Sequence, residues 1–296
     1  MARMELGIKP GQWGWSFDEL TRSWEAAEEA GFDILACFDH VTASPAPEAA
    51  WNAPSLLTAM AGRTESITLA VRVVDVSLRN PFLLAAELAV AQAASGGRLD
   101  VGLGAGSYHL GRFDHRAMSM NFPPHRHRIA RLGATCRVLP ALWRGERVDD
   151  DELGLIDASL GPIGIDPPRI TVGGESDGAL RIAAAFADRW NLSTPDPTSF
   201  DAARGRLERV IAEVGRTSPI VGEVQLWVRD LRSDARAHLR AFEDAGAEAA
   251  ILVLDEERGP DAVRRIADLT LQTPCRLGLA PGIEFAPWRA SPRQSP

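Results

Sequence analysis

The chain has 296 residues, more than the roughly 100–200 usual for one domain but within reach of a single α/β barrel. Hydrophobic residues make up 45% of it and charged residues 24%, so a sizeable core is expected and disorder is not. The net charge of −8 argues against nonspecific nucleic-acid binding, which needs a basic surface. Without a secretory leader or an apolar run of about 20 residues, we expect a cytoplasmic protein that does not enter membranes.

The cysteines point to a reducing compartment. Cys37, Cys136 and Cys275 are odd in number and widely separated along the chain. This spacing predicts neither a disulfide framework nor a CxxC metal site. We therefore expect reduced thiols, most of them buried.

Short β-branched or leucine-rich runs alternate with amphipathic segments from one end of the chain to the other. This alternation predicts parallel βαβ units with strands buried on both faces. Eight such pairs favour a TIM-type (β/α)8 barrel, with residues 1–296 as one domain, over an open doubly wound sheet. The predicted strands are 4–9, 33–39, 67–76, 99–105, 169–173, 189–193, 221–229 and 249–254.

Helix boundaries can be read from capping residues. Ser16 precedes an acidic first turn, and the helix that follows is expected to end at Gly31. Pro81 suits the first turn of another helix, which runs to Ala94. Gly246 marks the end of a third, just before the last predicted strand. Each signal places a helix between two predicted strands.

Two stretches interrupt this alternation. Residues 107–124 show no clear periodicity, and residues 145–168 are first acidic and then rich in Gly and Pro. We predict insertions after the fourth strand and before the fifth. Long loops after barrel strands lie over the active site, so 107–124 is the candidate lid. The tail beyond Pro274 is expected to be irregular.

Asp39 and His40 directly follow the second predicted strand. In a barrel, side chains just beyond the strand ends are those that meet a ligand. A histidine there can serve as general acid or base near neutral pH. The alternative is a histidine that caps a loop or packs at the rim.

The third predicted strand carries two charged residues, Arg72 and Asp75, within or at the end of an apolar run. Buried charges are costly unless they are paired or used. One interpretation is an ion pair between Arg72 and Asp75. The other is a polar lining for an anionic or flavin-like ligand.

Two glycine-rich turns follow predicted strands. The first spans residues 102–106 (GLGAG), and the second is Gly173-Gly174, which leads into a helix. Glycine permits close backbone approach, and N–H groups at a helix start can hold a phosphate. Neither turn matches a Rossmann or Walker motif. On one barrel face, the two turns suggest a ligand with a phosphate-bearing chain.

Four of the six histidines lie close together in sequence. Their spacing matches no closed zinc pattern, and arginines beside them would repel a cation. We predict no metal site and interpret the stretch as a cationic loop near the substrate. The histidines are His109, His115, His125 and His127, and the arginines are Arg112, Arg116, Arg126 and Arg128.

Residues 94–106 (ASGGRLDVGLGAG) resemble the signature of luciferase-like monooxygenases and coenzyme F420-dependent oxidoreductases. A second match is PPRITVGG at 167–174, followed by ADRWN at 187–191. Asp39-His40, the Arg79-Asn80-Pro81 step and FPP at 122–124 with Arg128 match in order. The resemblance covers roughly residues 4–193.

This resemblance implies a TIM-like barrel with a non-prolyl cis peptide near Arg72-Val73. His40 matches the histidine implicated in catalysis in F420-dependent sugar-phosphate dehydrogenases. A family glutamate just after the glycine run is absent, and Tyr108 and His109 are candidates to replace it. The residues implied to flank the cofactor ring are Asp39, Arg72, Val73 and Asp75, and those implied to hold its chain and phosphate are Ala105, Gly106, Ser107, Gly173 and Gly174.

The leading hypothesis is an enzyme that transfers a hydride between coenzyme F420 and a small organic substrate, with His40 exchanging a proton with that substrate. One alternative is a monooxygenase that uses FMN and O2. Another is a barrel that binds flavin or deazaflavin without catalysis. The family resemblance also implies a homodimer.

Overall fold

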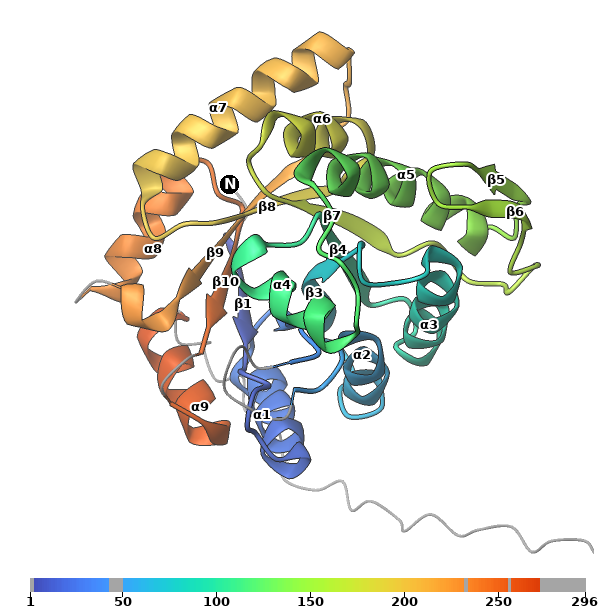
Figure 1. Ribbon diagram of the computed structural model, residues 1–296. Helices are drawn as coiled ribbons and strands as arrows, with labels where there is room; N and C mark the ends of the chain where they lie inside the picture. The colour runs from blue at the N-terminus through green and yellow to red at the C-terminus, as the bar shows by residue number, and fades with distance from the viewer. Residues whose placement is uncertain (1–2, 43–49, 232–233, 255–256, 272–296) are drawn as a thin grey trace, which may run out of the picture.

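The computed structural model describes residues 3–42, 50–231, 234–254 and 257–271. Eight parallel strands close into a barrel in the order β1-β10-β9-β8-β7-β4-β3-β2 (Figure 1), which confirms the predicted fold. These strands are β1 (Glu5–Lys9), β2 (Ile34–Cys37), β3 (Thr68–Asp75), β4 (Leu99–Gly104), β7 (Arg169–Gly173), β8 (Arg189–Ser193), β9 (Val221–Trp227) and β10 (Ala249–Val253).

The helices surround the barrel, and their ends follow the expected capping chemistry. Ser16 caps α1 through a reciprocal capping box with Glu19, and Gly31 ends it in the left-handed region at φ 87°. Pro81 begins α3 behind the cap Asn80. The helices are α1 (Phe17–Ala30), α2 (Ala53–Ala61), α3 (Pro81–Ala94), α4 (Tyr108–Ala117), α5 (His125–Trp143), α6 (Asp177–Phe186), α7 (Pro197–Val214), α8 (Ala235–Asp244) and α9 (Gly259–Thr270).

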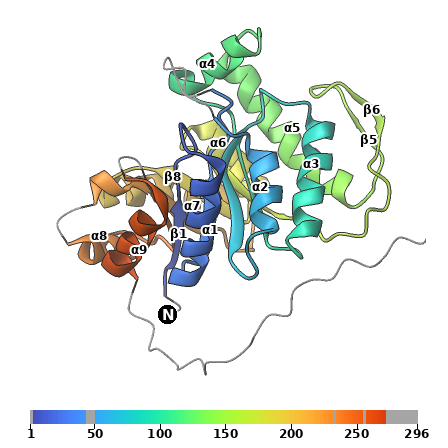
Figure 2. The same ribbon diagram turned by 90° about the horizontal axis from the view of Figure 1, so that it is seen from below.

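The segment 107–124 contains a helix that the sequence did not reveal. Ser107 caps α4, and its hydroxyl accepts from the backbone N–H of His109. Figure 2 shows α4 at one end of the barrel, with the N-terminus at the other. This helix has only ten residues, and histidines and arginines occupy much of it, so no repeated apolar pattern marks it in the sequence. Part of the segment that was expected to be a loop is therefore a helix that covers this end of the barrel.

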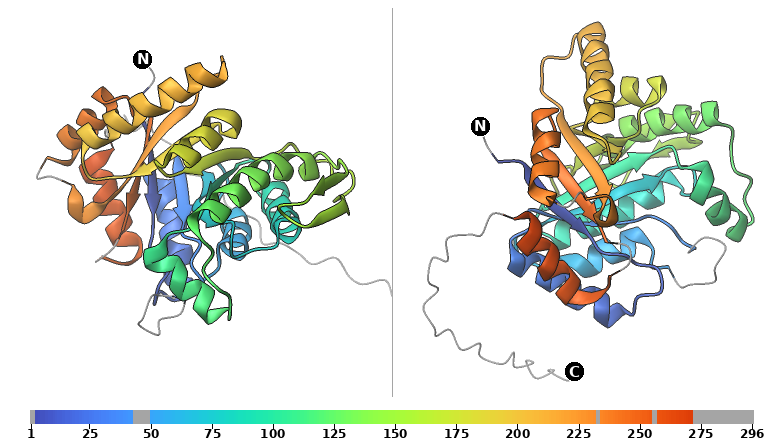
Figure 3. Two further views of the ribbon diagram at one scale, coloured as in Figure 1. Left: turned by 45° about the horizontal axis from the view of Figure 1, so that its top comes forward. Right: turned by 90° about the vertical axis from the view of Figure 1, so that its left-hand side faces the viewer.

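The second irregular stretch contains an antiparallel hairpin, β5 (Val148–Asp150) and β6 (Leu155–Ala158). Figure 3 shows it beside α5 and outside the barrel. The carboxylate of Asp150 pairs with Arg137 of α5, which ties the hairpin to that helix. The hairpin contributes no strand to the barrel sheet.

The core lies between the barrel and its helices. Trp143 and Trp190 are among its largest fully buried side chains. Cys37 and Cys136 are buried free thiols, as predicted, and burial raises the pKa of each to about 12. Cys275 and the tail beyond Pro274 lie outside the described residues. In the described part of the chain, no helix is both long and apolar enough to span a bilayer.

Candidate functional site

The barrel brings the predicted site residues to one end. Asp39 and His40 follow β2, and Asp75 is the last residue of β3. Residues 105–107 follow β4, and Gly173 ends β7. These strands are neighbours in the closed sheet, so their carboxyl ends share one rim, and α4 follows directly from this rim.

His40 is held by a carboxylate from α4. Its Nδ1 lies 2.6 Å from Oδ2 of Asp114, whose other oxygen accepts from the backbone N–H groups of Val41 and Thr42 at 3.0 and 2.9 Å. Burial alone would raise the pKa of Asp114, but the hydrogen bonds from His40 and Thr42 lower it overall. A carboxylate accepts, so Nδ1 carries the hydrogen and Nε2 of a neutral ring is left as the basic nitrogen.

Asp39 ties the second and third strand ends together. Its buried carboxylate pairs with Arg79 and accepts from the backbone N–H of Asp75 at 3.2 Å. Burial lowers the pKa of Arg79, but Asp39, with smaller contributions from Glu87 and Asp75, raises it overall. Asp39 is therefore fully engaged by protein groups, and this ion pair fixes the loop between β3 and α3.

Asp75 is one end of a chain of hydrogen bonds that leads to α4. Its Oδ1 accepts from the backbone N–H and the hydroxyl of Ser77, at 2.9 and 2.6 Å. The Ser77 hydroxyl also lies 3.1 Å from Nε2 of the buried His115. Oδ2 of Asp75 makes no hydrogen bond to the described residues. Burial, above all, raises the pKa of Asp75.

Val73 explains the glycines of the strand-four signature. The peptide bond between Arg72 and Val73 is cis, at the position that the resemblance implied. A Cβ on Gly102 or Gly104 would lie 2.8 and 2.4 Å from the Val73 side chain, and one on Gly173 would lie 3.1 Å from it. These glycines make room for the Val73 side chain. The sequence had suggested only that they permit close backbone approach to a ligand.

Arg72 points into the barrel and pairs with acidic residues far away in sequence, so the interpretation as an Arg72–Asp75 ion pair is wrong. Its guanidinium contacts Glu223 at 2.5 and 2.9 Å and Asp100 at 3.2 Å. Arg189 completes the cluster, 3.1 Å from Asp100. Burial would raise the pKa of Asp100, but the two arginines hold it below its usual value.

Lys9 lies at the carboxyl end of β1 and is fully buried. Its Nζ donates to the carbonyl of Arg72 and to Oε1 of Gln225, both at 2.7 Å, and sits 3.7 Å from the centre of the Phe38 ring. Burial lowers the pKa of this lysine to about 7. The buried Lys9 amine thus holds the carbonyl of Arg72, the residue directly before Val73.

Two arginines of α5 secure the loops at the rim. Arg128 donates to the carbonyls of Ala105 and Gly106, and Arg131 donates to those of Val76 and Arg79. These donors satisfy backbone carbonyls of the loops at the rim. The first glycine turn is therefore held by the Arg128 side chain of α5.

The second glycine turn is occupied by protein contacts. The N–H of Gly174 donates to the carbonyl of Asn191 at 3.0 Å, and the carbonyl of Gly174 accepts from the Trp190 indole at 2.7 Å. Glu175 and Asp177 stand beside this turn and pair with Arg206. An anion there would meet two carboxylates as well as the arginine.

The histidines do not gather around one point. His115 is buried and bonded to Ser77 and to the Gly111 carbonyl, whereas His109, His125 and His127 are exposed. Across the described ranges, no three His, Cys, Asp or Glu side chains form a set that could hold a metal. The stretch comprises α4, a short link and the first turn of α5, so much of the predicted cationic loop is helical, with Arg116 and Arg126 exposed and Arg128 buried.

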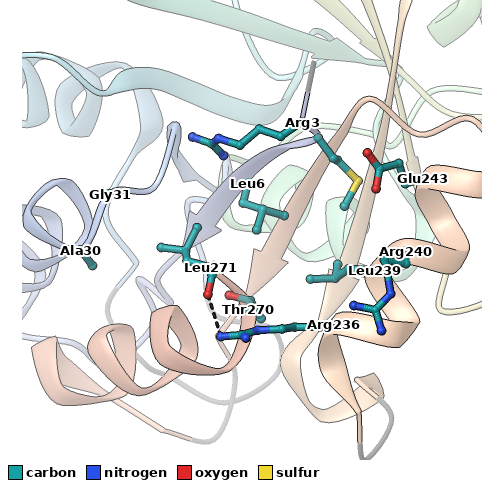
Figure 4. Close-up of a pocket in the computed structure, with 11 residues that line it drawn as sticks. Arg3, Leu6, Ala30, Gly31, Arg236, Leu239, Arg240, Glu243, Thr270 and Leu271 are labelled. Carbon is teal, nitrogen blue, oxygen red and sulfur yellow. Dashed lines mark hydrogen bonds between the residues drawn. The ribbon is translucent and has the colours of Figure 1, made fainter. Parts of the chain in front are cut away.

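A cavity of about 460 Å³ lies at the other end of the barrel. Figure 4 shows Arg3 and Leu6 of the β1 end facing Arg236 and Leu271, whose carbonyl accepts from Arg236 at 2.8 Å. None of the predicted site residues lines it. Ligand chemistry in such barrels belongs to the carboxyl ends of the strands, so we place the candidate site there.

Sequence reasoning missed three contributors to the site. Asp114 lies in a stretch without periodicity, and only the fold brings it to His40. Ser77 gave no signal because a lone serine in a loop is common. Lys9 did give a signal, since it is the only lysine in the chain and ends a predicted strand. That signal alone does not connect Lys9 to the site.

Comparisons with known proteins agree with this arrangement. The family described as luciferase-like monooxygenase matches residues 3–273. An F420-dependent glucose-6-phosphate dehydrogenase of Nakamurella multipartita is 25% identical over 277 residues, covering 90% of this chain and 79% of that one. An F420-dependent secondary alcohol dehydrogenase structure superposes with a TM-score of 0.76 at 15% identity, covering 90% of this chain and 98% of the other.

A monooxygenase also has a similar backbone. The EDTA monooxygenase from Chelativorans sp. BNC1 superposes with a TM-score of 0.71 at 15% identity, over 90% of this chain and 92% of that one. At these identities, the structural likeness concerns the fold alone.

Proposed function

The chain belongs to the luciferase-like monooxygenase family, and we propose that it is an F420-dependent oxidoreductase that transfers a hydride to or from a small organic substrate. The hydrogen bond between His40 and Asp114 carries this proposal. It gives the strand-end rim an oriented acid–base group beside the residues that resemble the family's cofactor site. The bound deazaflavin supplies hydride acceptance and donation, which no side chain can provide.

The residues at the rim fit a flat heterocycle. Val73 offers an apolar wall, and Asp75 has a buried oxygen without a hydrogen-bond partner among the described residues. Gly106 adopts φ 75°, and a Cβ there would lie 2.2 Å from that oxygen, so only glycine lets this turn lie against Asp75. Asp39 and Arg72 support this surface from behind through their ion pairs.

Positive charge beside the first glycine turn favours F420 over FMN, because F420 carries a longer anionic tail. Arg112 and Arg116 lie on α4, and Arg126 lies in the first turn of α5. These arginines are close together in sequence in a chain whose net charge is −8. We propose that Ala105, Gly106 and Ser107 line the phosphate-bearing part, with these arginines beyond them. Gly173 and Gly174, at the end of the neighbouring strand, would border the cofactor without binding its phosphate, because the N–H of Gly174 already donates to Asn191.

His40 would exchange a proton with the substrate. Asp114 orients the ring and holds the hydrogen on Nδ1, so Nε2 can take the proton of a substrate hydroxyl or return it. Trp13 and Phe38 pack beside the ring at centroid distances of 5.6 and 6.3 Å. These aromatic groups exclude water from one side of the imidazole. The covering helix α4 brings Asp114 to it.

Binding and turnover measurements test this function. The purified protein is titrated with F420 and, separately, with FMN, and cofactor fluorescence is followed. It is then assayed for F420 reduction with sugar phosphates and with secondary alcohols. We expect F420 to bind and His40→Ala to lose turnover while retaining that binding. Binding of FMN without F420 would support an FMN monooxygenase instead, and tight binding with no turnover would support a non-catalytic barrel.

We also propose a homodimer. Leu83 and Val90 lie seven residues apart on α3, and each is 57% exposed. Two large apolar side chains on one helix face are suited to burial against a second copy. Light scattering should give twice the chain mass for the native protein and a lower mass for Leu83→Glu/Val90→Glu. Leu269→Glu, an exposed position on α9, is the matched control and should leave the mass unchanged.

A further inference from the structure

The hydrogen bonds around Ser77 require one more proton than an ionised Asp75 and a neutral His115 together supply. The Ser77 hydroxyl lies between Oδ1 of Asp75 at 2.6 Å and Nε2 of His115 at 3.1 Å, and serine has only one hydrogen to donate. Nδ1 of His115 is 2.8 Å from the Gly111 carbonyl, which can only accept, so the imidazole hydrogen is on Nδ1. Nε2 of a neutral ring then has none.

Two arrangements satisfy both contacts. If Ser77 donates to Asp75, its oxygen must accept from Nε2, and His115 is an imidazolium facing a carboxylate. If Ser77 donates to Nε2, its oxygen must accept from a protonated Asp75. Both arrangements hold the same number of protons. They differ only in where the extra one resides.

Charged groups from several elements face Asp75 and bear on its protonation. Asp39 after β2 disfavours the carboxylate, and His115 of α4 favours it. Arg79 before α3 and the α5 arginines Arg128 and Arg131 also interact with Asp75. Burial is the largest influence and raises the pKa of the Asp75 carboxyl group. Desolvation thus opposes the carboxylate while the cations support it.

We propose that Asp75, Ser77 and His115 hold one shared proton, and that Asp75 is a second proton-exchanging side chain of the site, with Ser77 and His115 as its positioning residues. Oδ2 of Asp75 is the atom assigned to the ligand, because it is buried without a hydrogen-bond partner among the described residues and lies against the Gly106 turn that is proposed to line the cofactor. The exchange with a ligand rests on the proposed function, whereas the shared proton does not.

The proton step is balanced within these groups and the ligand. When the ligand gives up a proton, an O–H bond forms at Oδ2 and the ligand's bond to that hydrogen breaks. Ser77 keeps donating to Oδ1, and the His115 imidazolium donates to Ser77. The reverse step returns the proton to the ligand. When two hydrogens move from one molecule to another, each of the two molecules exchanges a proton. His40 exchanges a proton with one of these molecules.

Carbon-13 NMR of Asp-labelled protein, without any cofactor, tests the shared proton. Asp75→Asn assigns the Asp75 carboxyl signal by its loss. We expect this carboxyl group to titrate above the usual aspartate range. In Ser77→Ala its midpoint should shift to still higher pH, because the hydrogen bond that favours the carboxylate is lost. His115→Gln should shift it in the same direction and serves if Ser77→Ala does not fold.

A matched control is Ser23→Ala. Ser23 is also a buried serine, but its hydroxyl donates only to the Glu19 carbonyl at 2.7 Å in α1. This variant should leave the Asp75 midpoint unchanged. An ordinary aspartate titration, or a midpoint that neither Ser77→Ala nor His115→Gln moves, would overturn the shared proton.

Addition of F420 tests the exchange at Oδ2. In the native protein, F420 should shift the Asp75 carboxyl signal, and its affinity should depend on pH across that titration. Asp75→Asn should lose this pH dependence and reduce turnover at least about tenfold. F420 turnover with an ordinary Asp75 titration would overturn this inference and leave the proposed function standing. The expected titration in a protein that binds neither cofactor would support the shared proton and contradict the proposed function.

Discussion

Asp114 of α4 places a carboxylate oxygen 2.6 Å from Nδ1 of His40, a residue 74 positions earlier in the chain. The covering helix and the proposed acid–base group are therefore one unit. Any motion of α4 away from the barrel would leave His40 without its orienting partner, so the imidazole is set for chemistry only when the helix is in place.

Asp114→Asn should impair turnover without weakening F420 binding. An amide can present its NH2 group to Nδ1 and so favour the wrong tautomer, while the oxygen that remains can still cap Val41 and Thr42. General acid–base catalysis contributes about 10²–10⁴-fold, and we expect the variant to lose at least about tenfold in kcat. Steady-state kinetics with F420 fluorescence titration measures both quantities.

The control for Asp114→Asn is Asp150→Asn, a buried aspartate of the β5–β6 hairpin that pairs with Arg137. It should leave kcat unchanged. Equal losses in the two variants would mean that Asp114 acts through stability alone.

Lys9→Met should change how stability depends on pH. The unfolded lysine keeps its proton up to its ordinary pKa of 10.5, whereas burial lowers the pKa in the folded protein to about 7. Between these values the unfolded chain binds more protons, so the native protein gains stability relative to Lys9→Met as pH rises, by up to about 1.4 kcal/mol per pH unit. Urea unfolding at pH 6, 7, 8 and 9 measures this slope.

Below about pH 7 the difference between native protein and Lys9→Met should become constant, because Lys9 is then protonated in both states. Loss of the hydrogen bonds to Arg72 and Gln225 adds a constant offset and does not affect the slope. A difference that falls as pH rises from 7 to 9 would contradict the buried, low-pKa lysine.

Gly104→Ala should destabilise the fold by about 1–3 kcal/mol, because its Cβ would lie 2.4 Å from Val73 Cγ2. Val73→Ala removes that atom. The double variant should therefore lose less folding stability than the sum of the losses in the two single variants. Thermal or urea unfolding can measure this coupling. Strict additivity would show that the two side chains do not compete for the same space.

Gly133→Ala is the matched control for this cycle. Gly133 lies inside α5, where an added Cβ would meet Ile182 at an ordinary 3.6 Å. Alanine is the better helix former, so this variant should be neutral or slightly more stable. It should show no coupling to Val73→Ala.

Arg72→Met should cost about 3–5 kcal/mol of folding stability, because it leaves Glu223 and Asp100 buried with too few cations. Arg147→Met, which removes an exposed pair with Asp157, should have little measurable effect. Urea unfolding compares the two. If Arg72→Met kept native stability but lost F420 binding, Arg72 would act on the cofactor directly and not through the interior cluster.

The sequence by itself determined the eight βα units, the helix ends and the positions that reach the rim. Strand runs, the Ser16 cap and the Gly31 stop depend on residues a few positions apart, so their energetics are local. Once those units form a barrel, Asp39, His40 and Asp75 must meet at one end. Family-like motifs then indicated the cis peptide at Arg72-Val73 correctly.

Only the tertiary structure decided which side chains are partners. Glu223 pairs with Arg72 across 151 positions, and His115 reaches Asp75 through Ser77. No local period records such pairs, because burial of a charge selects whatever opposite charge or hydrogen-bond donor the closed barrel brings near. For the same reason the helix α4 forms where the sequence showed no helical period. Ser107 caps its first turn, and its Asp114 pairs with His40.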